Sequence, residues 1–73
     1  MKYFIKSTEK PGLILAGVGL GECAAAGNVV WTRSEDEALL LEEGEAEATI
    51  AFIGDVLDWE LAEELYIERQ EEN

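Results

Sequence analysis

Short runs of apolar residues, separated by turn-forming residues, predict strands in the first half of the chain. Residues 3–8 contain aromatic and β-branched side chains, which favour a strand. Pro11 followed by Gly12 is typical of a turn, because proline fixes φ at one position and glycine supplies a positive φ at the next. Residues 13–16 and 28–32 are two further apolar runs. The pattern therefore predicts three strands with a tight turn after the first.

Ala38–Leu41 fits a strand or a helix equally well by periodicity alone. We interpret it as a short strand, because the residues that follow it, Glu42, Glu43 and Gly44, interrupt the apolar run. A last strand is predicted at 64–68, where polar and apolar residues alternate.

A helix is predicted from Glu45 to about Ile53. Ala46, Ile50 and Ile53 are spaced to form one apolar stripe, which Leu57 extends. Gly54 is in the position of a residue that ends a helix in a left-handed conformation. The connection from 55 to 62 is expected to contain one helical turn around Trp59.

These elements predict a single α+β domain over residues 1–73. It consists of a small antiparallel sheet of four or five strands with one helix packed on one face, in the order β-β-β-β-α-β. A helix this short is marginal in water, so packing on the sheet must stabilise it. The glycines from Gly17 to Gly21 predict a bent hairpin.

Charge divides the chain into two unequal halves. Residues 1–34 carry four basic and two acidic side chains, a net +2, and residues 35–73 carry one basic and fifteen acidic side chains, a net −14. Such a field repels nucleic acid and membrane phosphates and attracts basic surfaces. Because 48% of the residues are hydrophobic, the chain is expected to fold and to carry this charge on its surface.

The residue types exclude several kinds of chemistry. The chain has no histidine and one cysteine, Cys23, so it cannot assemble the usual zinc sets or a disulfide, and we expect no metal and no cofactor. Gly17–Gly21 lacks the third glycine of a dinucleotide loop and the lysine of a phosphate loop. Without the usual nucleophiles and bases, the protein is not expected to be an enzyme. No apolar run is long enough to span a bilayer, and we expect a cytoplasmic protein.

What remains is the acidic surface, which is predicted to dock on a basic surface of a nucleic-acid-binding protein or complex. Rows of carboxylates on strands and helices can imitate the phosphates of a nucleic-acid strand. Trp59, between two acidic residues, is a candidate anchor, since tryptophan stacks on arginine, whereas Trp31 is expected to cover the core. The residues expected to contact the partner are Glu35, Asp36, Glu37, Glu42, Glu43, Glu45, Glu47, Asp55, Asp58, Trp59, Glu60, Glu64 and Glu68.

The sequence leaves two alternatives open. The acidic surface can be inert and serve only solubility. The domain can instead be a structural or assembly protein that associates with itself through a strand edge. We expect a monomer or a weak homodimer that binds neither nucleic acid nor membranes directly.

The stretch Trp31–Leu41, followed by Gly44–Ile50, resembles small phage and prophage domains in which a tryptophan strand leads to an Ala-Leu strand and a Glu-Ala-Glu-Ala helix. Several anti-CRISPR proteins are similar in size, in acidity and in having one sheet with one helix. The resemblance covers core positions and specifies no active site. It implies an inhibitor that occupies the target-DNA path of a CRISPR surveillance complex, of type I and with type I-C as one candidate.

Overall fold

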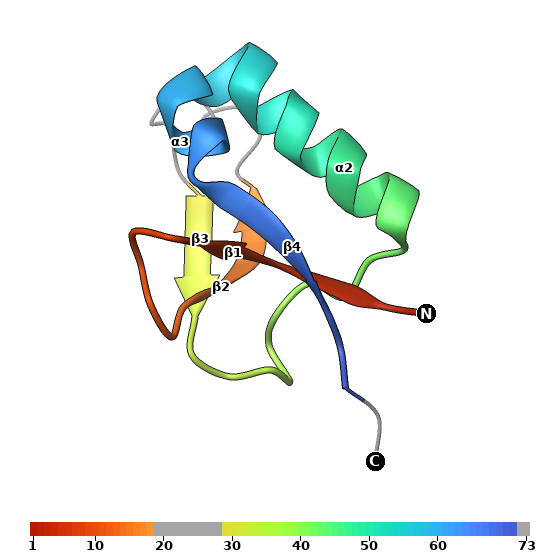
Figure 1. Ribbon diagram of the computed structural model, residues 1–73. Helices are drawn as coiled ribbons and strands as arrows, with labels where there is room; N and C mark the ends of the chain where they lie inside the picture. Colours follow the sequence, from red (N-terminus) through yellow and green to blue (C-terminus); the bar gives the residue numbers. More distant parts are fainter. Residues whose placement is uncertain (19–28, 72–73) are drawn as a thin grey trace.

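The computed structural model describes residues 1–18 and 29–71, which form a four-stranded antiparallel sheet with helices packed on one side (Figure 1). In chain order the elements are β1 (Tyr3–Ser7), β2 (Ile14–Val18), β3 (Val29–Thr32), α2 (Glu43–Phe52), a π-helical turn η1 (Ile53–Leu57), α3 (Trp59–Glu63) and β4 (Leu65–Arg69). The predicted α+β class, an antiparallel sheet carrying a helix, is confirmed. Among the described residues no helix has the length and apolar character required to cross a membrane.

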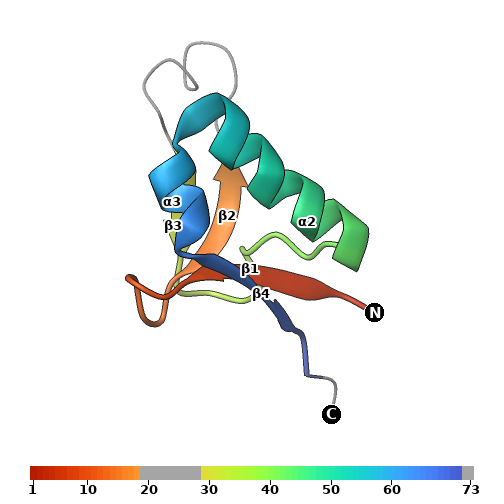
Figure 2. The ribbon, with the colours of Figure 1, turned by 45° about the horizontal axis from the view of Figure 1, so that its top comes forward.

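The strands follow the spatial order β3-β2-β1-β4. β4 pairs with β1 along its whole length, from Tyr3 opposite Arg69 to Ser7 opposite Leu65. β1 and β2 share a single aligned pair, Lys6 opposite Ile14. The β1–β4 pair and the β2–β3 pair therefore diverge from each other. In both views β2 and β3 run across the direction of β1 and β4 (Figures 1 and 2).

The predicted strand at 38–41 is the main difference from the expected order. Only Leu41 makes a bridge, exchanging two backbone hydrogen bonds with Tyr3 (2.8 and 3.0 Å). Leu39 N–H donates to the carbonyl of Leu15 at 3.0 Å. The segment thus lies where β1 and β2 diverge and bonds to both of them, which leaves too few residues in register with either strand for a fifth strand.

The first turn confirms the expectation from its sequence. Gly12 has φ of +83°, and Leu13 N–H donates to the carbonyl of Lys10 at 3.1 Å across Pro11 and Gly12. The pairing of β2 with β3 is irregular at the edge of the predicted glycine stretch, since its register shifts between Leu15 and Gly17. Residues 19–28 lie outside the described residues, and with them the rest of the predicted glycine-bent hairpin and Cys23.

The core lies between the sheet and α2. Ile5, Leu15, Ala46 and Ile53 are fully buried and form one cluster. Ile50 and Leu57 pack against this cluster, so the predicted apolar stripe of the helix is confirmed. Burying a side chain of this size contributes about 1.5–3 kcal/mol, and this packing stabilises a helix that would be marginal alone.

The helix does not end at Gly54 as predicted. Asp58 N–H donates to the carbonyl of Ile53 at 2.8 Å, which continues the helix as the wide turn η1. Gly54 has no positive φ. A Cβ at this position would lie 3.1 Å from the Cβ of Ala62, so the close approach of α3 favours glycine here.

The predicted helical turn around Trp59 is present as α3. It begins at Asp58, whose carboxylate accepts hydrogen bonds from the backbone N–H groups of Glu60 (2.9 Å) and Leu61 (3.3 Å). This is the usual arrangement of an N-cap, because the first N–H groups of a helix have no partner within it. α3 leads directly into β4 (Figure 1).

Candidate acidic interface

The acidic surface belongs to one long stretch of the chain. Between Arg33 and Arg69 there is no lysine or arginine. The structure exposes every residue that the sequence predicted to contact a partner except Glu64, which is half-buried. Some of these carboxylates form hydrogen bonds or ion pairs that stabilise the fold, whereas others have no such partner among the described residues.

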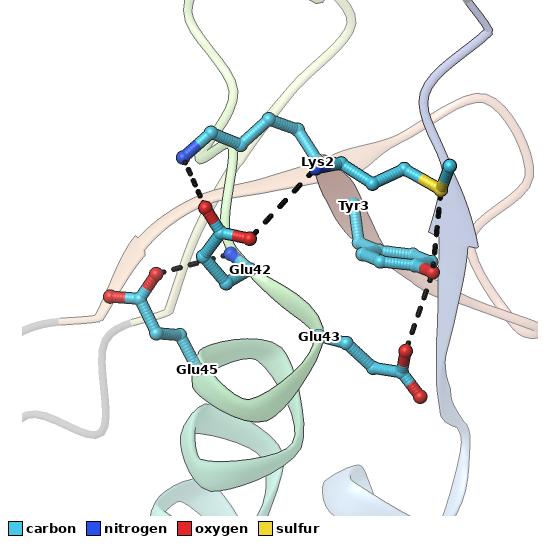
Figure 3. A network of polar contacts seen from close by, with 6 residues as sticks. Lys2, Tyr3, Glu42, Glu43 and Glu45 are labelled. Atoms are coloured by element: carbon cyan, nitrogen blue, oxygen red, sulfur yellow. Dashed lines mark hydrogen bonds and ion pairs between the residues drawn. The ribbon is translucent and has the colours of Figure 1, made fainter.

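Three predicted carboxylates lie at the start of α2, where two of them bind the N-terminal segment and the third caps the helix (Figure 3). Glu42 Oε1 lies 3.2 Å from Lys2 Nζ, and Glu42 Oε2 lies 4.0 Å from the N-terminal ammonium. Glu43 accepts a hydrogen bond from the Tyr3 hydroxyl at 3.4 Å. Glu45 accepts one from the backbone N–H of Glu42 at 3.1 Å. This group of carboxylates fixes the helix and is partly neutralised.

The charge of Lys2 changes the titration of Glu42. The hydrogen bond from Lys2 lowers the pKa of the Glu42 carboxyl below its ordinary value, and the positive charges of Lys2 and of the N-terminus lower it further. Glu42 therefore remains ionised to lower pH than an isolated glutamate, and its negative charge is largely offset at the surface.

Glu68 forms an ion pair with Lys6 on the neighbouring strand. The hydrogen bond from Lys6 to Glu68 raises the pKa of Lys6, against the opposing effect of burial. Alternation along β1 places Phe4 and Lys6 on the face of the sheet opposite to Ile5, and therefore opposite to α2. Glu35 and Glu71 line a hollow on that face together with Phe4, Lys6 and Glu68.

Three other predicted carboxylates are bound within the domain. Asp58 caps α3. Glu64 Oε2 accepts a hydrogen bond from the Ser7 hydroxyl at 3.2 Å. Glu37 accepts one from the Thr32 hydroxyl at 3.4 Å. These residues remain on the surface, but a partner would compete for groups that already stabilise the fold.

Four carboxylates of the helical layer have a different environment. Within the described parts of the chain, no hydrogen bond or ion pair is found for the side chains of Glu47 on α2, Asp55 on η1, and Glu60 and Glu63 on α3. All four are exposed. We refer to these four residues as the helical carboxylates.

The predicted contact residues thus do not share one side of the sheet. Glu47, Asp55 and Glu60 lie on the helices that cover one face, whereas Glu35 and Glu68 line the hollow on the other face. A single flat partner cannot contact both sets at once. The geometry favours the helical layer, because the opposite hollow also contains Lys6 and Arg69.

Two acidic residues that were not among the predicted contacts join this surface. Glu63, the last residue of α3, and Glu9, from the turn after β1, line a second hollow with Thr8, Glu60 and Glu64. Thr8 N–H donates to the carbonyl of Glu64 at 2.9 Å and so holds the turn beside α3. Glu9 could not be assigned from the sequence, because it precedes a turn in the nearly neutral half of the chain.

The two tryptophans occupy contrasting positions. Trp31 is partly buried against the core, as expected, and Lys10 Nζ lies 5.8 Å from the centre of its ring. Trp59, the first residue of α3, is 62% exposed. Tryptophan with this exposure, flanked by Asp58 and Glu60, has the accessibility that an interface anchor requires.

In the part of the chain that the structure describes, no group of three or more potential metal-binding side chains is arranged to hold an ion. Comparison of the chain with protein-family models, with curated proteins and with solved structures found no match.

Proposed function

We propose that this protein is a non-enzymatic inhibitor that occupies a basic, nucleic-acid-binding surface of another protein through its helical layer, as a mimic of the nucleic acid. The observation that carries the proposal is the set of helical carboxylates, which are exposed and have no cationic neighbour in the described residues. They lie on a stretch without any lysine or arginine.

The arrangement suits a partner whose own ligand is a phosphate backbone. Glu60 and Glu63 are three residues apart on α3, which places their Cβ atoms about 5–6 Å apart. Keeping like charges this close destabilises the folded domain by repulsion, whereas a basic surface would relieve that repulsion and accelerate association. The folded α2–η1–α3 layer presents the charges on helical backbone, which reduces the ordering that binding would require.

One class of target is suggested by the sequence resemblance. A CRISPR surveillance complex of type I, with type I-C as one candidate, holds DNA in a positively charged path. Small size, a single sheet with helices on one face, and marked acidity support this choice. The proposal of a basic nucleic-acid-binding partner does not depend on that particular target.

The test is capture from a host lysate with the tagged domain on beads, followed by displacement. Protein bound at about 50 mM NaCl should be released at about 500 mM, because screening shortens the reach of charge interactions. It should also be released by added double-stranded DNA at low salt. A captured protein that resists both treatments, and therefore does not use its nucleic-acid surface, would overturn the proposal.

A second candidate function is self-assembly, and the sheet order favours it specifically. In the described sheet β3 and β4 are the outer strands, and each pairs on one side only. An unpaired edge is a template for another strand. Sedimentation of the purified domain separates the two functions, since a tight dimer that is unaffected by changes to the helical carboxylates would support assembly.

A further inference from the structure

Two strongly exposed apolar side chains of the helical layer are close in sequence to the helical carboxylates. After Met1, the most exposed large apolar residues in the described chain are Trp59 at 62% and Val56 at 59%. They are three residues apart, so their Cα atoms lie within about 11 Å of each other. Asp55 and Glu60 immediately flank this pair in the sequence. We refer to Val56 and Trp59 together as the apolar pair.

The backbone holds the apolar pair outward. In η1, Ile53 is buried and Leu57 packs on the core, which leaves Val56 on the outer side of the turn. Trp59 follows Asp58, whose carboxylate fixes the first turn of α3 by two hydrogen bonds. An aromatic side chain on a fixed backbone loses little conformational freedom on binding, which favours its use as an anchor.

The surrounding charge decides what can cover the apolar pair. A second copy of this chain would bring the same carboxylates of Asp55, Glu60 and Glu63 against each other, and this repulsion opposes a dimer through this surface. Membranes and nucleic acids carry negative charge and are repelled in the same way. A basic protein segment is complementary both to the carboxylates and, where it carries an apolar side chain, to Val56 and Trp59.

We propose that the apolar pair is the centre of the interface and receives an apolar side chain that is flanked by arginines on a basic protein partner. Arginine suits this site better than lysine, because its planar guanidinium can stack on the indole of Trp59 and still bond to Glu60 or Asp55. This inference rests on the proposed function, and it adds a requirement for shape and apolar contact to the requirement for positive charge.

The test uses three synthetic helical peptides of about 18 residues, a length that can form a helix. The first has arginines and a stripe of leucines, the second replaces each arginine by lysine, and the third replaces each leucine by serine. Binding to the full domain is measured by calorimetry at low and moderate salt. The matched variants are Trp59→Ala, Val56→Ser and the control Tyr66→Ala, which removes a 40% exposed aromatic side chain from β4.

The arginine–leucine peptide should bind the wild-type domain more tightly than the other two. Trp59→Ala should weaken it by about tenfold or more, as expected when the anchor of an interface is truncated, and Tyr66→Ala should have little effect. Val56→Ser should weaken it in the same direction and provides an independent result if Trp59→Ala does not fold, which circular dichroism would show.

Two outcomes overturn the inference, and they differ in what they imply. If all three peptides bind equally and neither Trp59→Ala nor Val56→Ser changes affinity, the apolar pair has no role, while salt-sensitive binding leaves the proposed function in place. If no peptide binds even at low salt, the further inference and the proposed function both fail.

Discussion

Glu42 and Glu47 belong to the same end of the helical layer, yet their carboxylates have different surroundings. Glu42 lies beside Lys2 and the N-terminal ammonium. Glu47 has no such neighbour among the described residues. Both residues add one negative charge to the total, but Glu47 contributes more to the electrostatic field at the surface, because no nearby cation in the described part of the chain offsets its charge. The identity of each residue therefore matters less for binding than the presence of a nearby cation.

The lowered pKa of Glu42 predicts a specific dependence of stability on pH. A carboxyl whose pKa is lower in the folded than in the unfolded state contributes stability above its unfolded value, ordinarily 4.5, and loses that contribution as the pH falls through the folded value. Glu42→Gln should thus reduce the free energy of unfolding at about pH 7, and this reduction should become smaller as the pH is lowered to about 3, because protonation of the carboxyl removes the ion pair.

Urea unfolding of wild type and Glu42→Gln at both pH values measures this difference. Glu47→Gln is the matched control, because it removes an exposed glutamate that has no cationic neighbour, and it should not destabilise the domain at neutral pH. A deficit in Glu42→Gln that is equally large at both pH values would show that the ion pairs with Lys2 and the N-terminus are not its cause.

Among the elements, the wide turn η1 is the one that depends on packing between distant parts of the helical layer. Gly54 was expected to end a helix, but it lies inside η1, where α3 approaches it at the Cβ of Ala62. The wide turn buries Ile53 and leaves Val56 exposed. The same close packing that favours glycine therefore also positions the acidic and apolar side chains of the proposed interface.

Gly54→Val tests this packing. The new side chain would meet Ala62 and force η1 and α3 apart, which should destabilise the domain by about 1–3 kcal/mol, as overpacking typically does. Gly44→Val is the control, because a Cβ at Gly44 on α2 has no heavy atom within 4 Å. Thermal unfolding of both variants should show a lowered midpoint for Gly54→Val alone. Equal effects would mean that intrinsic helix preference, rather than the contact with α3, decides the result.

The strands and the helix could be predicted largely from local pattern, because β1 and α2 carry apolar residues at the periods of a strand and a helix. The segment 38–41 could not, since its place between β1 and β2 depends on backbone bonds from Leu41 to Tyr3 and from Leu39 to Leu15. These bonds join parts of the chain that are distant in sequence, and no local periodicity reports them.

The same reasoning applies to the candidate site. Exposure of the acidic residues followed from their number, because so many carboxylates cannot be buried. Which of them are neutralised depends on contacts such as Lys2 with Glu42 and Lys6 with Glu68, which form only when β1 meets the start of α2 and β4. For this reason Glu42 and Glu68 are weaker candidates for partner contact than the sequence suggested, and Glu63 is a stronger one.

At the scale of the whole molecule, a net charge of −12 on 73 residues should make the fold sensitive to ionic strength. Salt screens the repulsion among exposed carboxylates, so the unfolding midpoint should rise between about 20 mM and about 500 mM NaCl, by about 4–8 °C for each kcal/mol of repulsion relieved. The variant Asp55→Asn, Glu60→Gln, Glu63→Gln should begin with a higher midpoint and gain less from salt. A midpoint that falls with added salt would show that attractive ion pairs dominate instead.

The central claim is that the helical carboxylates, rather than acidity in general, contact the basic partner. Two variants with the same change in charge test it most directly. One carries Asp55→Asn, Glu60→Gln and Glu63→Gln. The other carries Glu35→Gln, Asp36→Asn and Glu71→Gln, of which Glu35 and Glu71 line the hollow that contains Lys6 and Asp36 follows Glu35 in the sequence.

The partner is the protein that is captured from the lysate by the wild-type domain and released by added DNA. The measurement is the affinity of each variant for this protein at about 50 mM NaCl, where charge interactions are little screened. The account predicts that the first variant loses most of the binding and that the second retains it. Equal binding by the two variants, or a greater loss in the second, would contradict it.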